Sequence, residues 1–132
     1  SCYSGLRQMG LHCKTVFIAL ADEDIHALKV FYQRLFEENP VVDIPNIYAE
    51  FRLPGLRLGL FKPKAGHEAE FGLSSNGRMS LCLEVEDLDA AIAHITALGY
   101  PPPGPIHHTS HGREIYAYDP SDNRLILHEA SI

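Results

Sequence analysis

Hydrophobic and polar residues follow two different periods along the chain, and the same order of periods occurs twice. Residues 14–21 form a short apolar, partly β-branched run, which predicts a strand. The acidic residues 22–24 follow, as is favoured where a helix begins. Apolar residues then recur at steps of three and four, which predicts an amphipathic helix that ends at Asn39-Pro40. The residues of this apolar face are Ile25, Leu28, Phe31, Tyr32, Leu35 and Phe36.

Short strands are expected after this helix. Residues 47–53 and 56–61 predict two strands that enclose a Pro54-Gly55 turn, and the pattern also allows a short strand near residues 41–44. Residues 62–77 change character, because they contain several Gly, Pro and Ser residues and few apolar ones. This composition is typical of a linker between two halves.

The pattern then begins again. Residues 79–85 predict a strand, and Asp87 begins a helix that is expected to stop at Gly99. Residues 101–105 are rich in proline and predict an extended loop. Two last strands, residues 113–118 and 124–128, enclose a turn at residues 119–123.

The two halves can be overlaid. An offset of 63 residues places residues 17–36 on 80–99 without a gap, so that Asp24 meets Asp87. An offset of 67 places residues 57–60 on 124–127, where three of the four pairs are identical. The order of the matches indicates an internal repeat and therefore an α+β fold built of two β-α-β-β-β modules. The expected domain spans residues 14–130, with module 1 at 14–63, a linker at 64–78 and module 2 at 79–130, after an N-terminal arm at 1–13.

Composition narrows the class of protein. The chain has 132 residues, of which 45% are hydrophobic and 21% charged, so an ordered globular domain is expected. The formal net charge of −6 and the lack of a basic stripe argue against a nucleic-acid partner. No apolar run approaches the length of a membrane span. The three cysteines cannot all pair within one chain and have no zinc-binding spacing, which favours a reduced, cytoplasmic location.

Three segments carry a more specific pattern. Residues 24–32 (DIHALKVFY) end in the aromatic pair Phe31-Tyr32, residues 85–91 (VEDLDAA) begin the second helix, and residues 112–124 hold a DPSDN turn. These segments resemble the vicinal oxygen chelate superfamily, which includes glyoxalase I, bleomycin-resistance proteins and extradiol dioxygenases. The turn departs from the family pattern, because its usual glycine is missing. The resemblance implies that the two modules form one half-open curved sheet, or cup.

Enzymes of this family hold a divalent metal at the base of the cup, with four ligands from equivalent strand positions. Carried over to this sequence, the positions are Phe17, Gly59, Ser80 and Ile126. Phe, Gly and Ile have no side-chain donor and Ser is a poor one, so the resemblance predicts no metal and no cofactor here. An alignment shift of two residues would instead reach Cys82, Glu84 or His128, which leaves a displaced metal open.

The segment 106–113 (IHHTSHGR) is a further candidate. If it is extended, His107, His111 and Arg113 share one face, which suits a carboxylate or a phosphate. A metal site that includes His108 and a solvated loop are the alternative interpretations.

Strand parity suggests which other side chains face the cup. Ser80 and Glu84 share one face, Arg57 and Phe61 flank Gly59, and two basic residues flank Ile126. Either these residues line a small-molecule pocket, or Phe17, Phe61 and Ile126 fill the cup as core. The candidate ligand-binding residues are Phe17, Arg57, Phe61, Ser80, Glu84, His107, His111, Arg113, Tyr116, Arg124 and His128.

The leading functional hypothesis is a homodimeric, metal-independent protein that binds a small aromatic or cationic molecule in the cup. The first alternative is a lyase or dioxygenase with a displaced metal, so whether the chain is an enzyme stays open. The second alternative is a protein–protein interaction module whose cup is filled.

Overall fold

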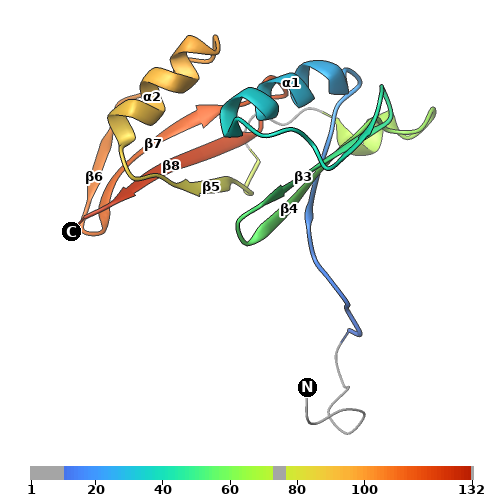
Figure 1. The fold of residues 1–132 in the computed structure, drawn as a ribbon, viewed down its shortest axis with the longest axis horizontal. Helices are drawn as coiled ribbons and strands as arrows, with labels where there is room; N and C mark the ends of the chain where they lie inside the picture. The colour runs from blue at the N-terminus through green and yellow to red at the C-terminus, as the bar shows by residue number, and fades with distance from the viewer. Residues whose placement is uncertain (1–10, 73–76, 132) are drawn as a thin grey trace, which may run out of the picture.

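The computed structural model describes residues 11–72 and 77–131, and they form two modules of the same design (Figure 1). Residues 1–10 of the expected N-terminal arm lie outside the described residues. The elements of the first module are β1 (Ile18–Ala21), α1 (Ile25–Phe36), β2 (Val42–Ile44), β3 (Tyr48–Leu53) and β4 (Leu56–Phe61). A short 3-10 helix, η2 (Glu68–Phe71), lies in the connection. The elements of the second module are β5 (Leu81–Glu84), α2 (Leu88–Ala97), β6 (His107–Thr109), β7 (Gly112–Tyr118) and β8 (Arg124–Ala130).

This order confirms the α+β fold of two repeated β-α-β-β-β modules. The strand orders are β1-β4-β3-β2 and β5-β8-β7-β6, so the first strand of each module lies beside the last. That pairing is parallel in both modules, with Ile18 opposite Leu58 and Leu81 opposite Leu125. Among the described residues, backbone pairing stops between the modules, so their eight strands form two four-stranded sheets rather than one continuous sheet.

Both helices begin for the same physical reason. The Asp24 carboxylate accepts a hydrogen bond from the backbone N–H of Ala27, and Asp87 accepts one from Ala90, at 3.2 and 3.1 Å. Each aspartate thereby satisfies a backbone donor that the first helical turn leaves unpaired. Gly99, with φ of 101°, follows α2 and takes the left-handed conformation that glycine adopts without strain.

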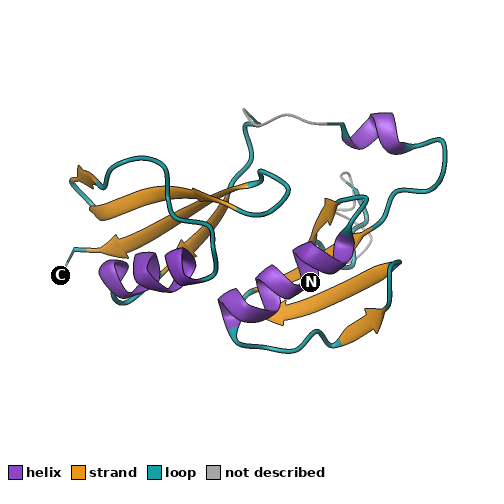
Figure 2. Ribbon diagram, turned by 90° about the horizontal axis from the view of Figure 1, so that it is seen from above, coloured by secondary structure: helices purple, strands orange, loops and turns teal. Residues whose placement is uncertain are grey.

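Each sheet has one face against a helix and one face turned away from it. Seen from above, each helix lies over its own sheet (Figure 2). Alternate strand residues point to the helix and are buried, which is the period of two expected of a half-buried sheet. The fully buried strand residues are Ala49, Phe51, Leu58, Leu60, Ala117 and Leu125. The other face of each sheet is called the open face below.

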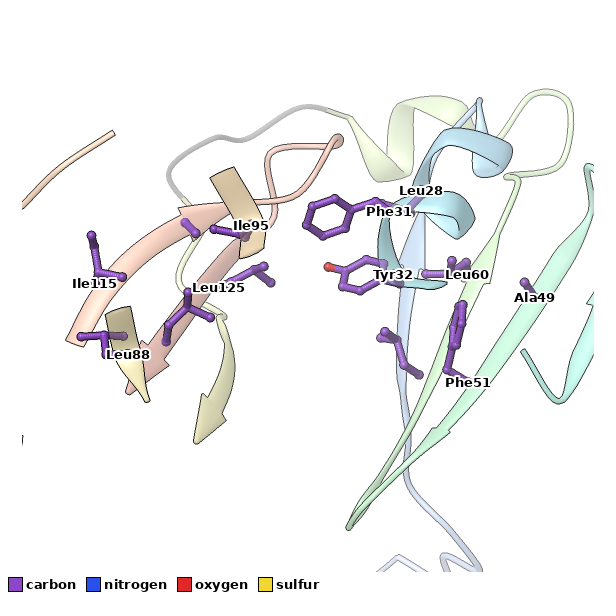
Figure 3. Packing of buried hydrophobic residues seen from close by; sticks show 13 residues of the cluster. Leu28, Phe31, Tyr32, Ala49, Phe51, Leu60, Leu88, Ile95, Ile115 and Leu125 are labelled. Atoms are coloured by element: carbon purple, nitrogen blue, oxygen red, sulfur yellow. The ribbon is translucent and has the colours of Figure 1, made fainter. Parts of the chain in front are cut away.

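The modules are joined by side chains of α1. Phe31 and Tyr32 lie on the side of α1 nearer to the second module (Figure 3). The Phe31 ring meets the ring of Tyr100 edge-on, with centroids 5.0 Å apart. The Tyr32 hydroxyl donates a buried hydrogen bond of 2.6 Å to Oδ2 of Asp119 in the β7–β8 turn. The Asp22 carboxylate accepts a hydrogen bond from the Ser121 hydroxyl of the same turn.

Asp119 also holds its own turn together. Its Oδ1 accepts hydrogen bonds from the backbone N–H groups of Ser121 and Asn123, at 2.8 and 2.9 Å. Its Oδ2 accepts one from the Asn123 side chain at 2.8 Å. The Phe31-Tyr32 pair and the DPSDN turn are therefore the two sides of one junction.

Three details differ from the sequence prediction. The first strand begins at Ile18, because the preceding residues 14–17 are exposed and unpaired. The strand β6 was expected only as an extended segment, and it pairs with β7 through His107 opposite Glu114. The last strand continues to Ala130. None of the described helices is long and apolar enough to cross a membrane.

Replacing Tyr32 with Phe tests the junction. The substitution keeps the buried ring but removes the hydroxyl that the Asp119 carboxylate accepts from. A hydrogen bond to a charged group contributes about 1.5–3 kcal/mol, so we expect Tyr32→Phe to lower the free energy of unfolding by that amount in urea titration. The control is Tyr116→Phe, because Tyr116 is 39% exposed and its change should cost less than about 0.5 kcal/mol. Equal effects of the two substitutions would contradict the assigned role.

Candidate functional site

The open face of the first module carries a stacked pair at its edge. Phe17, which precedes β1, is 39% exposed, and the Arg57 guanidinium lies 4.5 Å from the centre of its ring. Nε of Arg57 lies 3.5 Å from a carboxylate oxygen of Glu50 on β3. Phe17 is thus held from one side by a cation and leaves part of its ring accessible.

Next to this pair, the ring of Tyr48 covers Gly59. A Cβ atom at residue 59 would lie 2.9 Å from the Tyr48 hydroxyl and 3.3 Å from its ring. The hydroxyl donates a 2.7 Å hydrogen bond to Glu50. Desolvation, followed by this hydrogen bond, raises the pKa of Tyr48 above its ordinary value, so the phenol stays protonated at neutral pH. A larger side chain at residue 59 would require Tyr48 to move.

In the second module, the counterpart of Arg57 is Arg124. Nε of Arg124 on β8 donates a 2.8 Å hydrogen bond to the Ser80 hydroxyl, and its Nη2 donates to the Gly77 carbonyl. The contact fixes the guanidinium beside the start of β5. Ile126, two residues further along β8, is half-buried and lies opposite Cys82.

A cavity of about 360 Å³ lies between β1 and the start of β5. Phe17 and Leu20 line it from the first module, and Met79, Ser80 and Arg124 line it from the second. We call it the junction cavity. The structure thus brings three sequence-predicted candidates, Phe17, Ser80 and Arg124, to one place. Met79, which is 76% exposed, was not predicted, because a single Met before a strand carries no site signal.

Phe61 lies away from this cavity. Its ring packs edge-on against Phe71 of η2, with centroids 5.1 Å apart. Phe71 is itself 50% exposed, so the pair forms an apolar cover on the open face of the first module.

The other predicted candidates lie in a row across the second sheet. The register places Glu84 on β5 opposite His128 on β8, His128 opposite Glu114 on β7, and Glu114 opposite His107 on β6. These four side chains are called the ionisable row. Glu114 was missed at the sequence level, although it has the same strand parity as Tyr116, which was a candidate.

A hydrogen-bonded pair lies at one end of the ionisable row. Nδ1 of His128 lies 2.9 Å from both carboxylate oxygens of Glu84. This hydrogen bond, together with the negative charges of Glu84 and Glu114, raises the pKa of His128 above its ordinary value. At the other end, the His107 ring lies 5.3 Å from the Tyr116 ring, centroid to centroid.

The expectation that His107, His111 and Arg113 share one face is wrong. The chain turns at residues 110–111, so Arg113 lies on β7 beside α2 rather than beyond His107 on one strand. Nε of Arg113 donates to Glu129 at 3.0 Å, and its Nη2 lies 3.4 Å from Asp89 at the start of α2. The hydrogen bond from Arg113 lowers the pKa of Glu129 and raises that of the guanidinium. His111 is exposed in the turn itself.

Comparison with known proteins agrees with the fold described above. The family model described as Glyoxalase/Bleomycin resistance protein/Dioxygenase superfamily matches residues 14–127. The chain belongs to this superfamily. A search among curated proteins finds no match.

Solved structures with the same superfamily fold come from several bacteria. A protein of Agrobacterium tumefaciens solved by NMR is 25% identical, with a TM-score of 0.73 over 88% of this chain and 96% of that chain. A glyoxalase-related enzyme from Fulvimarina pelagi is 22% identical, with a TM-score of 0.71 over 89% and 88%. The fosfomycin resistance protein FosX from Listeria monocytogenes is 19% identical, with a TM-score of 0.72 over 92% and 94%. These similarities concern the fold.

The four positions that the resemblance assigns to metal ligands are occupied by Phe17, Gly59, Ser80 and Ile126. Phe17 and Ile126 have no donor atom, and residue 59 is a glycine covered by the Tyr48 ring. The Ser80 hydroxyl is engaged by the Arg124 guanidinium, whose positive charge disfavours a nearby cation. Within residues 11–72 and 77–131, no group of three or more His, Cys, Asp or Glu side chains is placed to hold a metal ion.

Substitution of Phe17 distinguishes a pocket wall from a core residue. The ring is 39% exposed and its described partner is the Arg57 guanidinium, so we expect Phe17→His to lower the free energy of unfolding by less than about 2 kcal/mol. The control is Phe51→His, because Phe51 is fully buried and the loss of its packed ring should cost about 3–5 kcal/mol. Urea titration measures both. A loss at Phe17 that matches the loss at Phe51 would mean that Phe17 belongs to the core.

Proposed function

We propose that this superfamily member binds a small organic molecule at the junction of its two modules without the help of a metal. The observation that carries the proposal is the replacement of the superfamily's metal ligands by contacts among the chain's own side chains. Tyr48 lies over Gly59, and Arg124 bonds to Ser80. Ser80 and Arg124 line the junction cavity from the second module, and the partly exposed ring of Phe17 lines it from the first.

The size and lining of the junction cavity suit a small ligand. Its volume of about 360 Å³ lies at the lower end of the range of roughly 300–1,000 Å³ that is usual for small-molecule sites. Apolar walls from Phe17, Leu20 and Met79 favour an aromatic or aliphatic group, and the Arg124 guanidinium adds one fixed polar contact. Mostly apolar walls with few polar groups are typical of such sites.

Other solved structures with this fold include a lactoylglutathione lyase from Agrobacterium tumefaciens and a FosX mutant in complex with Mn(II). Those activities belong to those proteins. For this chain we favour binding over metal-dependent lyase or dioxygenase chemistry, because the donor atoms such chemistry needs are missing at Phe17, Gly59 and Ile126. The accessible ring of Phe17 likewise favours a ligand pocket over a filled interaction module.

Metal-independent binding is tested by removing divalent ions. We expect the protein to purify without a stoichiometric metal by elemental analysis and to keep its melting temperature in EDTA. Aromatic fragments that raise the melting temperature should do so equally before and after EDTA, since binding to the folded state stabilises it by mass action. Phe17→Ala should weaken that shift, whereas Ile47→Ala, which removes an exposed apolar side chain outside the cavity, should not. One tightly bound metal per chain, with a lower melting temperature in EDTA, would contradict the proposal.

We also propose a homodimer. In the part of the chain that the structure describes, β1 and β5 each pair with one strand, so each sheet leaves one edge of its first strand without a partner. Unpaired strand edges favour association with another chain. A two-fold dimer would use the same surface of both copies.

Sedimentation tests the assembly. We expect a species of twice the 14.7 kDa chain mass at micromolar concentration. Asp substitutions at edge residues, such as Ala19→Asp, should shift the equilibrium to the monomer, because the new carboxylate lacks a partner in an interface. A species of 14.7 kDa alone would contradict the dimer.

We propose a cytoplasmic location because of the state of the cysteines. Cys13 and Cys82 are both free thiols and both exposed, which suits a reducing compartment. Cys2 lies outside the described residues.

A further inference from the structure

The ionisable row is not part of the junction cavity. Its members come from all four strands of the second sheet and share the open face, because their neighbours Leu83, Leu127 and Ile115 point to α2 and pack in the core. Four titratable side chains, one from each strand, therefore lie together on the open face of this sheet.

Charge within the row is only partly compensated. His128 is paired with Glu84, whereas the Glu114 carboxylate makes no hydrogen bond or ion pair with any described residue. Glu114 is nevertheless half-buried, between His128 and His107. Because no described side chain pairs with this carboxylate, it is available to a cation from outside the chain.

Aromatic rings lie beside this carboxylate. Tyr116 has the same strand parity as Glu114, two residues further along β7, and is 39% exposed. The His107 ring lies against it at an angle of 45°. Tyr116 lies opposite Ile126 on β8, and Ile126 lies opposite Cys82 on β5, so these three side chains are next to the ionisable row on the open face. A ring face attracts an ammonium group, and the apolar side chains next to it suit a hydrocarbon arm.

We propose that the ionisable row binds an organic ammonium group, with the cation at Glu114 and an apolar or aryl arm on Tyr116. The inference goes beyond the proposed function, since it places a second ligand, an amine or quaternary ammonium compound, on the open face outside the junction cavity. The cation breaks no described hydrogen bond of Glu114 and adds a positive charge beside it.

The charge state of His128 sets how this site depends on pH. Glu84 faces His128 from β5 and Glu114 faces it from β7, with His107 beyond Glu114 on β6 and Arg124 four residues away on its own strand. While His128 is protonated, its imidazolium competes with a ligand cation for Glu114. Because the pKa of His128 is raised, this competition extends above the ordinary histidine range and ends as pH rises further. The affinity for an ammonium ligand therefore increases with pH.

The test compares a cation with its neutral counterpart on the full chain. Phenethylammonium and 2-phenylethanol have the same aryl arm, and NMR titration of backbone amides measures both dissociation constants and locates the contacts. We expect the ammonium to bind at least about tenfold more tightly, with shifts centred on β7 and β8. Glu114→Gln should remove this preference. Glu38→Gln, which removes the same charge from an exposed residue that follows α1, should retain it.

Each other outcome overturns the inference. Equal affinity for the two probes, no binding of the ammonium at millimolar concentration, or shifts centred on Phe17 and Met79 would exclude a cation site at Glu114. The proposed function would survive these results if aromatic fragments still raised the melting temperature through Phe17. His128→Gln should abolish the increase of affinity with pH, and an unchanged pH dependence in that variant would refute the competition at Glu114.

Discussion

A buried hydrogen bond between a phenol and a carboxylate sets the arrangement of the two modules. Tyr32 reaches from α1 to Asp119, and Asp119 in turn holds the backbone of the β7–β8 turn. Burial and the neighbouring carboxylate raise the pKa of Tyr32 well above its ordinary value, so the hydroxyl remains a donor. Tyr32 and Asn123 also line the junction cavity. The distance between β1 and β5, and hence the shape of that cavity, depends on this contact.

The fold could be predicted from sequence to the extent that its elements repeat a period. Alternation of apolar residues identified β4, and steps of three and four identified α1, because one face of each is buried in the core. The strand β6 carries no such signal. Its residues, His107 to Thr109, are all polar and exposed, and they are held in a strand only by pairing with β7. Tertiary contact, rather than local preference, makes this strand.

The candidate site was predictable where the alternation of residues along one strand decides which face a side chain lies on. Arg57 and Phe61 lie on the face expected of them, as do Arg124 and His128, because a strand turns alternate residues to the same side. Contacts across strands were not predictable. Tyr48 covers Gly59 from a different strand, and one tight turn removes Arg113 from the face that it was expected to share. Such contacts depend on register, which a single sequence does not state.

The junction between the modules is asymmetric although the modules repeat. In the overlay of the two halves, the counterpart of Tyr32 is Ile95. Arg52 opposite Arg57 matches Tyr118 opposite Arg124, so the next residue, Leu53, is the counterpart of Asp119. Neither counterpart can reproduce the hydrogen bond, since the isoleucine side chain has no donor and the leucine side chain has no acceptor. Duplication of either half alone would therefore not rebuild this molecule. Each half supplies one side of a contact that the other half cannot supply, so a change at Tyr32 has to be matched by a change at Asp119 for the contact to persist.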